Sequence, residues 1–314
     1  MIIKPAPGYE GHLLSYYNES GKHSTEELNR AREQQGKAIL NYCLPEGMTM
    51  EDITISGPDE GQTLKLRTFR PSGLPPKAPV VLDIHGGGFV GGNLDIDNYR
   101  CIALAQGTPC LVYSVEYRLS NKDVHFPAPL MDCLTAFLWI RENAELIGAD
   151  ADRIALHGTS AGATLSAGLA LYLRDKFFIK PALTIINCPV LTLGSGARIS
   201  AYQNAAYSLD PPDVMSPPFI YVGDLDGKTP SYYAFPGYCP SFEQLGPHAV
   251  VVAEYDAFRD EGVEYAVKLM RAGVPCEMIA APRVGHGFCT IDEELTRLVH
   301  GMMCYSLRRE FSIK

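Results

Sequence analysis

Short apolar runs alternate with stretches of helical pattern along most of this chain, and this alternation restricts its fold more than any other feature. The runs are nearly continuous in apolar residues, as expected of strands that are buried on both faces. Strands that alternate with helices predict a mostly parallel sheet covered by helices on both sides, which is an α/β fold. The six runs are residues 80–84, 110–115, 154–156, 182–188, 249–253 and 275–280.

Two further strands are expected ahead of these runs. Residues 51–56 and 64–69 alternate between apolar and polar side chains, and a turn rich in Gly, Pro and Asp joins them. This pattern is typical of an antiparallel hairpin. The sequence therefore predicts a sheet of eight strands with an antiparallel hairpin at one edge.

Charge and cysteine usage exclude several classes of partner and site. The 314 residues carry a formal net charge of −9, which argues against nucleic acid or an anionic membrane as a partner. The nine cysteines are scattered and include no C-x-x-C pair, so neither a disulfide framework nor a zinc site is expected. Because the first residues lack the apolar segment of a signal peptide and no run reaches the length of a membrane span, we expect a cytoplasmic protein.

The segment Gly158-Thr159-Ser160-Ala161-Gly162 lies between one of the predicted strands and an Ala-rich helix. Gly-x-Ser-x-Gly in this place is the pattern of a nucleophile elbow, a strained turn that presents the serine at the start of the helix. The residues two before and two after the serine approach closely in such a turn, so glycine is needed at both positions. Taken alone, the motif fits an ordinary turn equally well.

A second glycine-rich segment, His85-Gly86-Gly87-Gly88, directly follows the first of the six runs. Three consecutive glycines leave backbone N–H groups unshielded, as an oxyanion hole requires. A flexible loop and a phosphate cradle are the alternatives, since the segment and its continuation formally satisfy G-x-G-x-x-G. A phosphate site is disfavoured for two reasons. Residues 92–95 are unfavourable for the start of a helix, and no acidic residue follows about 20 positions later, where a dinucleotide-binding motif has one.

The order of these two motifs predicts where further catalytic groups lie. His-Gly-Gly-Gly followed by Gly-x-Ser-x-Gly is the order of the lipase and esterase branch of the α/β-hydrolases, in which an acid and then a histidine follow later strands. Asp256 comes soon after the fifth run, and His286 stands between two glycines after the sixth. Asp260 is the main alternative acid, although it fits the N-cap of the next helix, and Asp224 and Asp226 are weaker candidates.

From about residue 50 to its C-terminus the chain resembles the hormone-sensitive-lipase family of bacterial-type carboxylesterases, in the branch with Gly-Thr-Ser-Ala-Gly at the elbow. Two departures stand out. The family usually has Pro-Leu where this chain has Ala257-Phe258, and Ala-Pro-Glu where it has Ser120-Asn121-Lys122. The matching stretches are residues 85–89, 116–119, 126–129, 132–133, 158–162, 256, 259–262 and 285–288.

This resemblance implies an α/β-hydrolase fold, with a mostly parallel eight-stranded sheet flanked by helices and a helical lid built from the N-terminus and an insertion. We expect an N-terminal lid segment in residues 1–45, a hydrolase core in residues 46–192 and 247–314, and a lid insertion in residues 193–246. The insertion is rich in Pro, Gly and Tyr. Its aromatic side chains would suit the wall of a pocket for a neutral organic substrate, and a mobile surface segment is the alternative.

The resemblance also implies acyl transfer through a covalent intermediate. Ser160 would attack the ester carbonyl, His286 would take its proton, and Asp256 would fix the imidazole tautomer. Neither a metal nor an organic cofactor is needed.

The groups expected to stabilise the tetrahedral oxyanion are backbone N–H groups from both motifs. His85 is expected to order its own loop. The donors would be Gly87, Gly88 and Ala161, with Gly86 as a further contributor.

The predicted function is a serine carboxylesterase for short acyl esters, from acetyl to butyryl. The same triad would serve an amidase or a deacetylase acting on a specific small molecule, and a non-catalytic ligand-binding protein of the same fold is a remote alternative. The expected partner is a small-molecule ester, with no nucleic acid and no membrane. The sequence leaves the oligomeric state open. Because members of the family often pair edge strands, the resemblance makes residues 275–280 the candidate edge for a homodimer.

Overall fold

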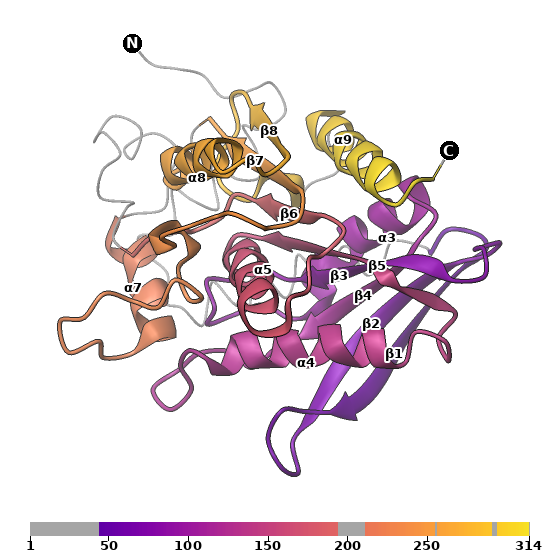
Figure 1. Ribbon diagram of the computed structural model, residues 1–314, viewed down its shortest axis with the longest axis horizontal. Helices are drawn as coiled ribbons and strands as arrows, with labels where there is room; N and C mark the ends of the chain where they lie inside the picture. Colours follow the sequence, from indigo (N-terminus) through magenta and orange to yellow (C-terminus); the bar gives the residue numbers. More distant parts are fainter. Residues whose placement is uncertain (1–43, 194–210, 255, 291–293, 314) are drawn as a thin grey trace.

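A single eight-stranded sheet runs through the molecule, with helices on both of its faces (Figure 1). The computed structural model describes residues 44–193, 211–254, 256–290 and 294–313. The predicted N-terminal lid, residues 1–45, therefore lies almost entirely outside the described residues. The strand order is β1-β2-β4-β3-β5-β6-β7-β8.

The sheet confirms the predicted number and direction of strands. β1 pairs antiparallel with β2 and β2 antiparallel with β4, whereas all other neighbours are parallel. The predicted hairpin forms one edge of the sheet, and the last apolar run forms the other. The strands are β1 (Met48–Ser56), β2 (Thr63–Pro71), β3 (Ala78–Ile84), β4 (Leu111–Glu116), β5 (Ala149–Thr159), β6 (Thr184–Asn187), β7 (His248–Ala253) and β8 (Cys276–Ala281).

Two hydrophobic cores, one on each face of the sheet, explain why the central strands are apolar at nearly every position. In β3, Val80 and Leu82 belong to one core, and Val81 between them belongs to the other. This arrangement is the one predicted for strands that alternate with helices. The first core is covered by α4 (Ala128–Glu142), α5 (Ala161–Tyr172) and α8 (Arg259–Arg271), and the second by α3 (Asn98–Gly107) and α9 (Glu294–Glu310).

The strand order determines which loops meet at the carboxyl ends of the strands. β3 and β5 are parallel neighbours, with Ile84 beside Gly158 in the register. The glycine loop after β3 and the serine turn after β5 therefore emerge side by side. The loops after β7 and β8 leave the same edge of the sheet, since these strands are also parallel to β5 through β6.

One helix was not expected from the sequence. After the glycine loop, the 3₁₀-helix η2 (Leu94–Asp97) leads directly into α3. The side-chain oxygen of Asn93 accepts the backbone N–H of Asp95 at 3.0 Å, which caps the start of this turn. The prediction that this segment opens a helix poorly is therefore wrong, because it overlooked the asparagine cap.

The described part of the predicted insertion packs on the core. It begins with α7 (Pro211–Val222), and farther along the chain Phe235 is fully buried in the first core. The hydroxyl groups of Tyr232 and Tyr233 each bind the carboxylate of Asp175 at 3.0 Å. These two tyrosines, which the sequence suggested as pocket wall, bind a carboxylate just beyond the C-terminal end of α5.

Most of the described cysteines lie in the interior of the protein. The eight that are described form no disulfide, and seven of them are buried. Within the same described ranges, no helix combines the length and apolar character needed to cross a membrane.

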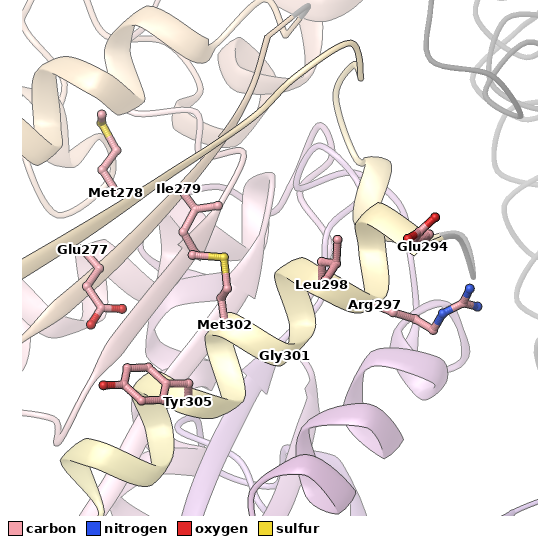
Figure 2. A pocket seen from close by; sticks show the side chains of 9 residues that line it. All are labelled: Glu277, Met278, Ile279, Glu294, Arg297, Leu298, Gly301, Met302 and Tyr305. Carbon is pink, nitrogen blue, oxygen red and sulfur yellow. The ribbon is translucent and has the colours of Figure 1, made fainter.

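A groove of about 690 Å³ lies beside β8 at the edge of the sheet, where α9 packs next to it (Figure 2). Met278 of β8 and three residues of α9, Leu298, Met302 and Tyr305, line the groove. Each of these four residues is between 45% and 60% exposed. The edge strand thus carries an apolar surface beside its outer backbone edge, which no strand of the described residues pairs with.

Candidate active site

Ser160 lies in a strained turn between β5 and α5. Its φ of 56° and ψ of −120° lie in a region that a serine rarely adopts. The backbone N–H donates to the carbonyl of Asn187 at the end of β6, at 2.8 Å, which holds the turn in place. This conformation is the one required of a nucleophile elbow.

The glycines on either side of Ser160 are required by close backbone contacts. A Cβ on Gly158 would lie 2.2 Å from the carbonyl oxygen of Gly162. A Cβ on Gly162 would lie 1.9 Å from the carbonyl oxygen of Ile84, in β3. Both distances are far below contact, so no larger residue fits while the turn packs against β3.

Ser160, His286 and Asp256 form one chain of hydrogen bonds. The Nδ1 atom of His286 lies 2.9 Å from Oδ2 of Asp256, and its Nε2 atom lies 2.7 Å from Oγ of Ser160. An ionised carboxylate can only accept, so Nδ1–H donates to Asp256 and Nε2 is left to accept the serine proton. The other carboxylate oxygen accepts the N–H of Phe258 at 2.9 Å, which fixes the orientation of the acid.

Of the four carboxylates considered from the sequence, Asp256 is the one that the structure joins to His286. It is buried, at 3% exposure. Asp260 lies in the first turn of α8 and not at its N-cap, because the helix begins one residue earlier. Asp224 accepts the N–H of Asp226 at 2.9 Å in an exposed turn.

The loop after β3 lies against the serine turn. A Cβ on Gly86 would stand 2.9 Å from the carbonyl oxygen of Thr159, and one on Gly87 would stand 1.9 Å from that of Gly91. Gly87 and Gly88 both have positive φ, 127° and 65°. Their N–H groups donate to no backbone acceptor within the described ranges, so they are available to a ligand.

The start of α5 adds an electropositive end to this region. Ala161 is the first residue of the helix, directly after Ser160. The N–H groups of a first helical turn have no partner inside the helix, and the positive end of the helix dipole favours negative charge there.

His85 stabilises the conformation of the glycine loop. Its ring is fully buried, and Nδ1 donates to the carbonyl of Gly86 at 2.7 Å. The ring stacks on Tyr117 with centroids 4.2 Å apart, and the Tyr117 hydroxyl donates to the carbonyl of His85 at 2.9 Å. Burial lowers the pKa of His85, so the imidazole stays neutral at neutral pH and acts as a positioning group.

The insertion contacts the same loop through α7, which the sequence did not reveal. The ring of Tyr221 stacks on Phe89 with centroids 4.0 Å apart. The side chain of Pro217 lies 3.1 Å from a Cβ placed on Gly88. Because the insertion has no clear periodicity, nothing in its sequence pointed to these contacts.

Cys188 is a further neighbour of the site that the sequence did not single out. It follows β6 directly and is buried, and its Sγ atom, a carboxylate oxygen of Asp256 and a ring nitrogen of His286 all lie within 4.8 Å of one another. Its position at the carboxyl end of a strand could be expected, because residues that directly follow parallel strands gather at one edge of the sheet. Its contact with Asp256 could not, because a cysteine that ends an apolar run counts as one more apolar residue.

Comparisons with known proteins agree with this fold and geometry. A model of the alpha/beta hydrolase fold family matches residues 81–290. Esterase LipI of Mycobacterium tuberculosis is 35% identical over 240 residues, which cover 76% of this chain and 74% of LipI. The ethyl acetate hydrolase of Pseudomonas putida is 30% identical over 298 residues, which cover 88% of each chain.

A solved structure is similar over nearly the whole length. The esterase LipW from Mycobacterium marinum matches with a TM-score of 0.84 and 30% identity, covering 98% of each chain. The chain therefore belongs to the α/β-hydrolase family, as a carboxylic ester hydrolase of the hormone-sensitive-lipase type.

Proposed function

We propose that this protein is a serine carboxylesterase that hydrolyses short acyl esters, from acetyl to butyryl, through an acyl-enzyme. The observation that carries the proposal is the hydrogen-bonded chain from Ser160 through His286 to Asp256, beside a loop in which two N–H groups bind no backbone acceptor of the described residues. A nucleophile, a base, an orienting acid and oxyanion donors are the groups that acyl transfer requires.

The first half of the reaction acylates the serine. Oγ of Ser160 attacks the ester carbonyl carbon while its proton passes to Nε2 of His286, 2.7 Å away. Asp256 stabilises the imidazolium that forms, and the imidazolium then protonates the leaving alcohol. In the second half, Nε2 takes a proton from water while the water oxygen attacks the acyl carbon. The bond from this carbon to Oγ of Ser160 then breaks, Nε2 returns the proton to Oγ, and the carboxylic acid leaves.

The oxyanion of each tetrahedral intermediate binds to N–H groups of Gly87, Gly88 and Ala161, with Gly86 as a further donor. The side chain of Pro217 lies 3.1 Å from a Cβ placed on Gly88 of this loop. We propose that this contact restricts the room for the acyl group and thereby favours short acyl chains. The ethyl acetate hydrolase of Pseudomonas putida, a relative of this chain, is named for an acetyl ester.

The test is hydrolysis of a p-nitrophenyl ester series from acetate to palmitate. We expect kcat/KM to be highest between acetate and butyrate and to fall by about 10⁶ in Ser160→Ala. Ser56→Ala is the matched control, because this serine is exposed at the end of β1, far along the sheet from the site.

Other results would redirect the proposal. A folded protein that cleaves the matching p-nitroanilides faster than the esters would be an amidase. A protein that cleaves neither but still binds an ester analogue after Ser160→Ala would be a ligand-binding member of the family.

Two further properties belong to this proposal. We propose that the protein pairs with a second copy through β8, because no strand of the described residues pairs with the outer side of β8, which carries exposed apolar side chains. We also propose a reducing, cytoplasmic location, which the buried thiols of the described cysteines support.

A further inference from the structure

The carboxylate of Asp256 faces a further hydrogen-bond donor besides His286 and the N–H of Phe258. The thiol of Cys188 bonds to this carboxylate, and the backbone N–H of Gly287 donates toward its sulfur. Burial and the nearby carboxylate raise the pKa of Cys188 well above its usual range, so the group is a thiol and not a thiolate. The thiol of Cys188 and the imidazole of His286 thus both donate to the carboxylate of Asp256.

The three ligand atoms are close to the spacing that a tetrahedral cation needs. A zinc ion bonded to sulfur at about 2.3 Å and to nitrogen and oxygen at about 2.0 Å holds its ligand atoms about 3.3–3.6 Å apart. Here no separation exceeds 4.8 Å, and the Nδ1 to Oδ2 distance is 2.9 Å. Small side-chain rotations therefore bring all three atoms to bonding distance.

The backbone around these side chains is well fixed. The N–H of Cys188 donates to the carbonyl of Val251 in β7 at 2.8 Å, and the N–H of Phe258 holds one oxygen of Asp256. Such outer contacts orient the ligands of a metal site. The side chain of His286 is 13% exposed, whereas that of Asp256 is not exposed, so a cation would enter from the histidine side.

We propose that Cys188, Asp256 and His286 form a binding site for one thiophilic divalent cation, of the zinc and cadmium class, and that the cation inhibits the enzyme. A thiolate and an imidazole select such cations over Mg²⁺ and Ca²⁺, which prefer oxygen ligands. Three protein ligands leave the fourth position of the cation to water.

When the cation binds, the Nε2 atom of His286 can no longer act as the general base, because protons move at Cys188 and His286. The Cys188 thiol loses its proton to solvent, so two anionic ligands neutralise the charge of the cation. The cation binds to the lone pair of Nδ1 of His286. This nitrogen therefore loses its proton, and Nε2 gains one, so the imidazole stays neutral in its other tautomer. Nε2 then faces Ser160 as an N–H and cannot accept the serine proton.

Binding of the cation depends only on the side chains of Cys188, Asp256 and His286. Inhibition by the cation also depends on the proposed esterase function. The test therefore measures the two separately. Binding is measured with Cd²⁺, under a non-chelating phosphine reductant, from the ultraviolet charge-transfer absorption of a thiolate–cadmium bond and from calorimetric titration.

We expect one Cd²⁺ per chain with a charge-transfer band that disappears in Cys188→Ser. Cys276→Ser is the matched control, because Cys276 is the described cysteine that is not buried. It should keep the band. A second variant, His286→Gln, removes a different and partly exposed ligand and should weaken binding at least about tenfold, since even outer-shell partners of metal ligands are worth about 10- to 100-fold.

Inhibition is then measured with Zn²⁺ on p-nitrophenyl acetate, each protein relative to its own metal-free rate. We expect inhibition that EDTA reverses and that Mg²⁺ does not cause, with an inhibition constant at least tenfold higher in Cys188→Ser. Equal Cd²⁺ affinity in wild type, Cys188→Ser and His286→Gln, or loss of the band in Cys276→Ser alone, would overturn the site. Cd²⁺ binding as expected in a protein without esterase activity would instead refute the proposed function and leave the cation site standing.

Discussion

Asp256 and Asp260 lie four residues apart and have the same chemistry but opposite surroundings. Asp256 is buried, and its two oxygens accept the N–H of Phe258 and Nδ1–H of His286. The side chain of Asp260 is 69% exposed and pairs with Arg259 on the outside of α8. Position after the strand, and not the residue type, decides which carboxylate can orient the histidine.

We therefore predict that Asp256→Asn lowers kcat for p-nitrophenyl acetate by about 10⁴, because the amide no longer selects the imidazole tautomer that leaves Nε2 free to accept a proton. Asp260→Asn should stay within about twofold of wild type. Steady-state kinetics on both variants, with circular dichroism to confirm folding, provide the measurement. If Asp260→Asn were the inactive variant, the assignment of the acid would be refuted.

Most residues of the candidate site could be predicted, because each follows an apolar run that the sequence reveals as a parallel strand. Two neighbours could not. Cys188 ends such a run and counts as one more apolar residue, so its polar role beside Asp256 left no trace in the pattern. Pro217 belongs to an insertion without periodicity, and its contact with the glycine loop depends on a tertiary packing that no local pattern encodes.

At the scale of secondary structure, the junction between β5 and α5 is the most tightly constrained part of the fold. The turn lies against the end of β3, and the two glycines that flank it have no space for a side chain. α9 is different, because a Cβ on its Gly301 would meet nothing within 4 Å. The same substitution should therefore have opposite effects in the two places.

We predict that Gly162→Ala lowers the free energy of unfolding by at least about 1–3 kcal/mol, the usual cost of overpacking. Gly301→Ala should raise it by about 0.4–1 kcal/mol, because it removes the conformational entropy of glycine from the unfolded chain inside a compatible helix. Urea denaturation of the two variants and wild type measures both effects. A stabilising Gly162→Ala would contradict the close contact with Ile84.

The sequence predicted the buried strands well, but it did not predict the helix after the glycine loop or the packing of the insertion. Buried parallel strands were found because both faces are covered and nearly every position is apolar. The 3₁₀-helix η2 was missed, because its start depends on one hydrogen bond, in which the Asn93 side chain accepts the N–H of Asp95. α3 follows η2 directly, and its own N-cap, Asp97, makes no side-chain capping bond. The described part of the insertion carries large buried side chains such as Phe235, but they contact the first core singly and leave no repeating pattern.

At the scale of the whole molecule, β8 and α9 form the face most suited to association. Two copies that pair their β8 strands about a twofold axis would extend the sheet and cover the groove of Figure 2. We predict a dimer by light scattering, with twice the 34.4 kDa mass of the chain. Met278→Lys, which places a charge on the edge strand, should give monomers.

The matched control for that experiment is Leu146→Lys, because Leu146 is 82% exposed and lies outside the groove. This variant should remain dimeric. A wild-type protein that is monomeric at micromolar concentration, or a Met278→Lys variant that stays dimeric, would refute pairing through β8.

The stability of the whole fold should fall in mild acid, because it contains buried neutral histidines. His248, at the start of β7, is 1% exposed, and its Nδ1–H donates to the carbonyl of Gly246 at 2.8 Å. Burial lowers the pKa of His248 from 6.5 to about 4. Between these two pH values the unfolded chain binds a proton that the folded chain does not, so the contribution is fully present above pH 6.5 and is lost as the pH falls toward 4.

We predict that His248→Gln makes the loss of stability between pH 7 and pH 5 smaller by about 2 kcal/mol, because only the unfolded wild-type chain gains a proton at this residue in that interval. Ser56→Ala is the control, because this exposed residue of β1 does not titrate and its replacement should leave the pH dependence unchanged. Urea denaturation at the two pH values measures the difference, which is independent of any constant cost of the substitution. Equal losses of stability in His248→Gln and wild type would contradict this prediction. They would mean that His248 takes up its proton in the folded protein as readily as in the unfolded chain, although it is buried in β7.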